Sequence, residues 1–151
     1  MAAIARSAVR AMKCSVVLAL LAYSVSFARQ SSHASSGARA QVAAVAEALS
    51  SGDASAAMTH FAKSYREYDK LRHYFEGLSA FQVENQLDIT DEEDTDNSVL
   101  LTITWDITLT DLGSDRSRRR TSDIHAKLTL LDSKWRIVEF SPVDIFNPQV
   151  H

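Results

Sequence analysis

The sequence has a single cysteine, Cys14, which lies within its first 28 residues. The other 123 residues therefore exclude a disulfide scaffold and a cysteine-bound metal. Acidic residues are absent from residues 1–28, whereas residues 29–151 hold 13 of the 16 basic residues and all 19 acidic ones, a net charge of −6. This acidic balance argues against nucleic-acid binding. A chain segment of this length is typical of one domain and can bury a large enough core to fold without disulfide bonds.

Residues 1–28 have the three parts of a secretory signal peptide. Residues 1–13 are basic and acid-free, residues 14–27 are mostly apolar, and Ser26 and Ala28 place small side chains before a cleavage site. The alternative is an uncleaved membrane anchor, but crossing a bilayer takes about 20 apolar residues. We expect cleavage near Ala28, no stable membrane span afterwards, and a secreted or periplasmic protein.

Helical patterns follow a polar stretch. Residues 29–37 are rich in serine and lack large apolar side chains, which predicts a flexible lead-in. Apolar residues then recur at spacings of three and four in 42–49, and Gly52 and Asp53 are suited to end one helix and to cap the next, which carries Ala57, Met58 and Phe61. A third helical pattern runs through 65–78. The sequence therefore predicts three helices.

From Ala80 the apolar period changes from 3.6 to 2, which is typical of strands. We expect strands over residues 81–89, 99–110, 123–130 and 135–141. In the second, apolar residues alternate with threonines and Asp106, so one side is wet or covered by a partner. In the fourth, residues of both parities are apolar, so the pattern does not decide which side of this strand faces the core. Helices followed by a four-stranded antiparallel meander predict an α+β fold.

Several features of residues 38–148 occur together in one known superfamily. They are the helix pair around 48–58, the third helix, the long strands, a turn followed by Lys134-Trp135-Arg136-Ile137, and the closing segment 142–148. On these features the domain resembles the nuclear transport factor two-like superfamily, the cystatin-like cone that includes SnoaL-like proteins, and in particular its secreted, uncharacterised bacterial members. The resemblance implies a curved sheet wrapped around three N-terminal helices as a cone-shaped barrel, with a pocket at the open end and frequent dimerisation. It implies no activity, because one fold hosts enzymes and plain binders.

The resemblance implies that acid–base groups, where present, lie inside the cone on the parity of the apolar residues. Asp106 and His125 have the opposite parity and should point away from the helices, so we favour a surface role over a catalytic pair. Glu139 shares parity with Trp135 and Ile137. If it faces inward, its pKa would be raised and it would be the best candidate for a general base. The alternative is an exposed edge-strand carboxylate.

Other candidate sites are few. Tyr74, Asn85 and Trp135 are the candidate ligand-binding residues, although a buried asparagine satisfied by the backbone is an alternative for Asn85. The five histidines show no tight ligand spacing, so we expect no metal site, and no motif indicates a cofactor. The acidic residues 91–96 lack calcium-loop spacing and predict a solvated hairpin tip, opposite an arginine-rich tip at 116–120. This polarity suggests head-to-tail association as a hypothesis.

The expected function is non-catalytic binding of a small apolar ligand or a protein partner. The expected oligomer is a homodimer through the outward sheet face, which carries Thr102, Thr104, Asp106 and His125. One alternative is a SnoaL-like lyase, isomerase or hydrolase with Glu139 as general base, helped by Tyr74 or Asn85. Another is a structural assembly subunit. A partner nucleic acid is not expected.

Overall fold

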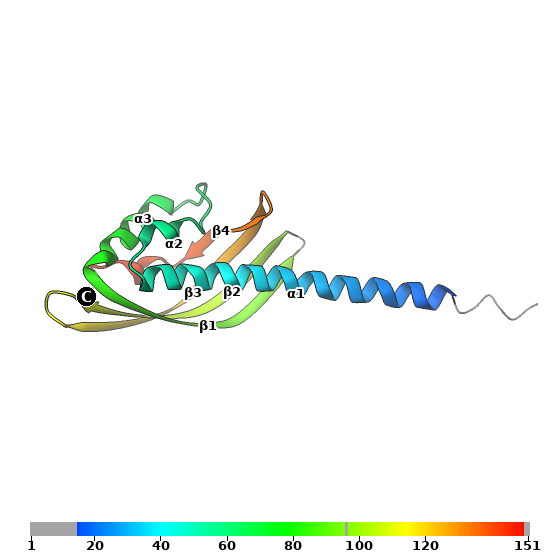
Figure 1. The fold of residues 1–151 in the computed structure, drawn as a ribbon, viewed down its shortest axis with the longest axis horizontal. Helices are drawn as coiled ribbons and strands as arrows, with labels where there is room; N and C mark the ends of the chain where they lie inside the picture. The colour runs from blue at the N-terminus through cyan, green and yellow to red at the C-terminus, as the bar shows by residue number, and fades with distance from the viewer. Residues whose placement is uncertain (1–14, 96, 150–151) are drawn as a thin grey trace, which may run out of the picture. The chain divides into compact units, whose positions relative to one another are not determined.

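The computed structural model describes residues 15–95 and 97–149 (Figure 1). The chain forms two compact units, Met1–His33 and Ala34–His151, and helix α1 (Ser15–Ser50) begins in the first and ends in the second. Residues 1–13 and Cys14 lie outside the described residues, so the signal peptide stays a prediction. Within the described ranges, no helix combines the length and the apolar character that a membrane span needs.

The second unit has the expected α+β architecture, with helices on one face of an antiparallel sheet (Figure 1). Its strands follow one another in the order β1-β2-β3-β4. After α1 the elements are α2 (Ala54–Met58), α3 (Tyr68–Gly77), the 3-10 turn η1 (Leu78–Ala80), β1 (Phe81–Thr95), β2 (Ser98–Asp111), β3 (Ser117–Leu131), β4 (Lys134–Ser141) and the 3-10 turn η2 (Asp144–Phe146).

The turn between α1 and α2 forms as the sequence predicts. Gly52 has a φ of 73°, a conformation that costs glycine little, and it follows the last residue of α1 closely. Asp53 then caps α2, because its carboxylate accepts a 2.8 Å hydrogen bond from the amide of Ala56.

Residues 29–37, for which the sequence predicts a flexible lead-in, are helical and belong to α1. The part of α1 from Ala34 onward is held by contacts that the spacing of apolar residues does not predict. The hydroxyl of Ser35 donates to Asp94 at 2.7 Å, and Arg39 Nε donates to Glu92 at 2.6 Å. At Gly37 the helix approaches Trp135 so closely that a Cβ would lie 2.6 Å from the indole. Tertiary contacts override weak local propensity here.

A bulge in β1 decides where the acidic segment points. The pairing of β1 with β2 slips between Ile89 and Asp91, so that one residue is added to β1 and the parity of its side chains reverses. Glu92 and Asp94 thereby face α1 and make the two contacts just described. Burial alone would raise the pKa of Glu92, but the nearby Ser35 hydroxyl and the hydrogen bond and charge of Arg39 lower it. The acidic segment ends in the expected hairpin, where Asp94 is exposed, but Glu92 is partly covered by α1.

A second slip, in the pairing of β3 with β4 between Lys127 and Leu128, explains the ambiguous pattern of β4. Ile137 precedes the irregularity and Phe140 follows it, and both are buried although their parities differ. The free edge of β4 is also partly covered. Ala62 donates its amide to the carbonyl of Ile137 at 2.9 Å, and Ile137 donates its own to the carbonyl of His60 at 2.9 Å.

The second and third helices are shorter than the apolar spacing predicts. Phe61, expected in the second helix, instead forms an isolated parallel bridge with Ile137. Tyr65, expected in the third, precedes it and turns inward, and its hydroxyl donates to the carbonyl of Phe140. Burial raises the pKa of Tyr65, and the charge of Glu67 raises it further.

Aromatic rings fill the space between the helices and the sheet. Phe140 packs edge-on against Phe61 and Trp105, and Phe146 packs edge-on against Phe75 and Trp105, with centroids 5.2 to 5.9 Å apart. Of the residues that the structure describes, no polar or charged one is buried. The core is therefore dry and apolar.

Candidate functional site

Asn85 connects α1 to the sheet. Its side-chain amide donates to the carbonyl of Ala46 and to the hydroxyl of Ser50, both at 3.0 Å, and its oxygen accepts from the indole N–H of Trp105 at 2.9 Å. Trp105 is fully buried, so this is the partner that its N–H requires. These three hydrogen bonds hold the half-buried Asn85 within the chain, as the alternative prediction of a satisfied asparagine describes.

The other predicted site residues lie apart from one another. The hydroxyl of Tyr74 donates to Asp144 at 3.3 Å beside the C-terminal segment. Trp135 packs against Gly37 of α1. The side chain of Glu139 is 70% exposed, and one of its oxygens lies 3.5 Å from Lys127 Nζ. Glu139 is therefore an exposed edge-strand carboxylate, as the alternative prediction has it, and does not face inward as a general base would.

The outward face of the sheet carries Asp106 and His125, as their parity predicts, but the structure does not bring them together. Asp106 accepts hydrogen bonds from Arg119 at 2.9 Å and from Thr121, whereas His125 lies beside Thr102 at 3.3 Å. The hydrogen bonds from Arg119 and Thr121, and the charge of Arg119, lower the pKa of Asp106. The two residues belong to separate cross-strand pairs and form no acid–base unit.

The arginine-rich segment serves the chain itself. Arg120 donates to the carbonyls of Ile145 and Asn147, at 3.0 Å and 2.5 Å, and Arg118 donates to the carbonyl of Pro148 at 3.3 Å. Arg119, the outward residue between them, pairs with Asp106. These arginines hold the C-terminal segment and one cross-strand pair, and head-to-tail association through this tip stays a hypothesis.

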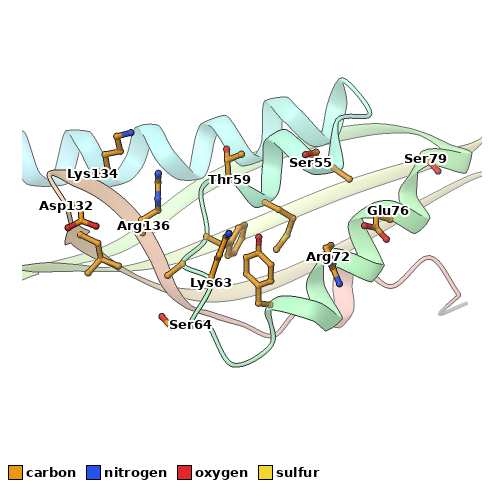
Figure 2. A pocket seen from close by; sticks show the side chains of 16 residues that line it. Ser55, Thr59, Lys63, Ser64, Arg72, Glu76, Ser79, Asp132, Lys134 and Arg136 are labelled. Carbon is orange, nitrogen blue, oxygen red and sulfur yellow. The ribbon is translucent and has the colours of Figure 1, made fainter.

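A wide concavity among the described residues lies outside the aromatic core. It is a groove of about 1220 Å³ between α2, α3, the segment that joins them, and the start of β4 (Figure 2). That volume exceeds the 300–1,000 Å³ range of ordinary ligand pockets, as suits an open groove. Its lining consists of Ala54, Ser55, Met58, Thr59, Phe61, Ala62, Lys63, Ser64, Tyr68, Arg72, Glu76, Ser79, Leu131, Asp132, Lys134 and Arg136.

The groove has an apolar floor and a charged rim. Met58, Phe61 and Ala62 are buried at its base, where they join the molecular core at their other side. Figure 2 shows Lys134, Arg136 and Lys63 toward one end, and Arg72 with Glu76 on α3 toward the other.

The rim carries four cations and two carboxylates, which inverts the acidic charge of the chain locally. Arg72 is paired with Asp69 at 3.1 Å. Across the described ranges, no carboxylate lies within ion-pair distance of Lys63, Lys134 or Arg136. The pKa of His60 is lowered, mainly by burial and also by the charge of Arg136, which places that guanidinium beside the 59–64 segment.

Solved structures share this arrangement of helices and sheet. The chain aligns with a conserved protein from Planctomyces limnophilus at a TM-score of 0.67 and 11% identity, covering 73% of this chain and 95% of that one. It aligns with an NTF-2-like protein of unknown function from Shewanella oneidensis at 0.58 and 14%, covering 70% and 95%. The chain has the nuclear transport factor 2-like fold. No family model and no curated protein matches it.

A further structural neighbour is a proposed aromatic ring hydroxylase from Novosphingobium aromaticivorans. Its TM-score is 0.60 and its identity 10%, over 72% of this chain and 86% of that one. At such identities the likeness concerns the fold, and the site has to be read from this chain's own residues.

Sequence reasoning missed this groove. Its cations come from three separate segments and look like ordinary surface residues. None of the predicted ligand-binding residues Tyr74, Asn85 and Trp135 lines the groove, whereas Tyr68, which was not among them, does. The one available signal was Lys134-Trp135-Arg136, in which two cations share a parity at the start of a strand.

Proposed function

We propose that the chain is a non-catalytic binding protein whose ligand occupies the groove. The observation that carries this proposal is the contrast between a core without buried polar groups, over the described residues, and an external groove with an apolar floor and a polar rim. Ligand sites commonly combine an apolar surface with a few polar groups that orient the ligand.

The placement of the ionisable residues supports binding over catalysis. General acid–base chemistry needs groups within hydrogen-bond reach of one reacting atom. Glu139 is paired with Lys127 on an exposed surface, and Asp106 and His125 are engaged with different partners. The lyase, isomerase or hydrolase alternative therefore receives no support from these positions. If a turnover assay is found, its loss in Glu139→Gln would reverse this preference.

Native mass spectrometry of protein purified from its own compartment tests the proposal. We expect a chain that lacks residues 1–28, if the signal peptide is cleaved near Ala28, together with a bound small molecule. Ser55 is exposed and lines the groove, so Ser55→Trp should fill it and remove the added mass. Ser114→Trp, in the exposed turn after β2, is the control that should retain it. Added mass that persists in Ser55→Trp would contradict the groove as the site.

We also infer a homodimer through the outward face of the sheet. The support is a surface on which Thr102 pairs with His125 and Thr104 with Asp123, since threonines in such ladders pack while they hydrogen bond. Sedimentation equilibrium should show a dimer for the wild type and a folded monomer for Thr104→Arg, which places a charge at the centre of that face. A wild-type mass equal to one chain at all concentrations would refute it.

A further inference from the structure

We propose that the ligand of the groove is a single-chain anionic amphiphile, a molecule with one negatively charged head group and an apolar tail. This inference rests on the proposed function, because it assumes that the groove is a binding site. It adds the charge of the ligand, its shape, and the residues that recognise each part.

The floor of the groove suits an apolar tail. Met58 and Phe61 are 4% and 3% exposed, so each presents a small part of its surface to the groove while the rest packs in the core. The partly buried ring of Tyr68 and the 40%-exposed side chain of Leu131 extend this surface toward both ends of the groove. A tail that covers this surface removes apolar area from water on both partners, the general source of such binding.

The rim suits an anionic head group. Lys63, Lys134 and Arg136 line the same groove, and none of them has a carboxylate at ion-pair distance in the described part of the chain. The remaining cation, Arg72, is already paired with Asp69. The carboxylates Glu76 and Asp132 also line the groove, but the four cations outnumber them. The net positive charge of the rim, in an otherwise acidic domain, attracts an anion and disfavours a cation.

An extended acidic peptide fits this groove less well. Peptides commonly bind a sheet by pairing with the backbone of a free edge. At the groove, the amide and carbonyl of Ile137 on the edge of β4 are already paired with His60 and Ala62. A peptide would find side chains there, but no row of open backbone groups to fix its register.

Isothermal titration calorimetry with three probes of equal tail length tests the proposal. The probes are dodecanoate, whose alkyl tail is undecyl, the neutral detergent undecyl maltoside and the cation undecyltrimethylammonium, each kept below its micelle concentration. We expect dodecanoate to bind about tenfold more tightly than the neutral probe, and the cation to bind most weakly. Shortening the anionic tail by one methylene should weaken binding about fourfold.

Charge variants connect the preference to the rim. Lys63→Gln, Lys134→Gln and Arg136→Gln should each weaken dodecanoate binding by about two- to fivefold and leave the neutral probe unchanged. Arg66→Gln is the matched control, because Arg66 is exposed in the same connecting segment but does not line the groove. It should change neither affinity.

The outcomes separate this inference from the proposed function. Equal affinity for all three probes, blocked by Ser55→Trp, would keep the groove as a binding site but overturn the anionic ligand. Failure of all three probes to bind, in protein that also carries no added mass when purified from its own compartment, would overturn both. Sedimentation with anionic phosphatidylglycerol vesicles without binding of free dodecanoate would mean that the cations contact a membrane surface, and would overturn the free amphiphile.

Discussion

The two faces of the sheet leave very different groups available to other molecules. On the inner face, apolar side chains from β2, β3 and β4 pack against the helices. The polar exception is Asn85, whose side chain forms hydrogen bonds with α1 and with Trp105. On the outer face, threonines, Asp106 and His125 pair across the strands and stay accessible. The groove lies outside the inner layer, beside the edge of β4. The fold thus places most of the groups that hold it together on the inner face and leaves polar groups accessible on the outer face.

The largest effect that would test this separation is at Asn85. Asn85→Ala should lower the free energy of unfolding by about 2 kcal/mol, because the buried indole N–H of Trp105 loses its acceptor and α1 loses two hydrogen bonds. Urea unfolding measures this, with Gln86→Ala, its exposed outward neighbour, expected within about 0.5 kcal/mol of the wild type. Equal losses at the two positions would mean that the two faces do not differ as described.

A smaller and pH-dependent effect is expected at Glu92, which the bulge turns toward α1. Glu92→Gln should cost about 0.5 to 1 kcal/mol at pH 7 through the lost ion pair with Arg39. The pKa of Glu92 is lower in the folded chain than in the unfolded one, so the stabilisation is present above the unfolded value of about 4.3 and is lost as pH falls through the folded value. Unfolding curves of both proteins should therefore converge in acid. A difference that stays constant down to pH 2 would exclude the ion pair as its cause.

The smallest effect is expected on the outer face. Thr104→Val keeps the β-branched shape but removes the 2.7 Å hydrogen bond to Asp123, which is exposed to water. The free energy of unfolding of the monomer should change by less than about 0.5 kcal/mol, because water replaces the lost partner. Thermal unfolding at low protein concentration measures it. A loss comparable to that of Asn85→Ala would show that the outer face contributes to stability as much as the inner face does.

Most of the fold could be predicted because burial leaves a period in the sequence. The alternation through β2 predicted the inner and outer faces, including the outward positions of Asp106 and His125. The bulge in β1 could not be predicted, since it falls where neither parity carries an apolar run beyond Ile89. The helical character of residues 29–37 was missed for a related reason. The part of α1 from Ala34 to Arg39 is held by two polar contacts and by the close approach of Gly37 to Trp135, and such contacts leave no apolar period.

The candidate site was harder to predict than the fold. Lys63, Arg72 and Lys134 belong to different segments, and each alone resembles any solvated cation. Their common groove exists because the 59–64 segment pairs with the edge of β4, a contact between residues more than 70 positions apart. Periodicity describes how one segment faces its neighbours, and it carries no information about such pairings.

The contact between Gly37 and Trp135 makes the fluorescence of Trp135 sensitive to a local event, whereas the fluorescence of Trp105 reports on global unfolding. The chain has two tryptophans, and Trp105 is fully buried in the core whereas Trp135 lies against the bare backbone of α1 at Gly37. Emission from Trp105 should shift to longer wavelength only on global unfolding. Emission from Trp135 should shift as soon as the first turns of α1 in the second unit lift from the sheet. Detachment of that helix could thus be followed without any added label, apart from the unfolding of the core.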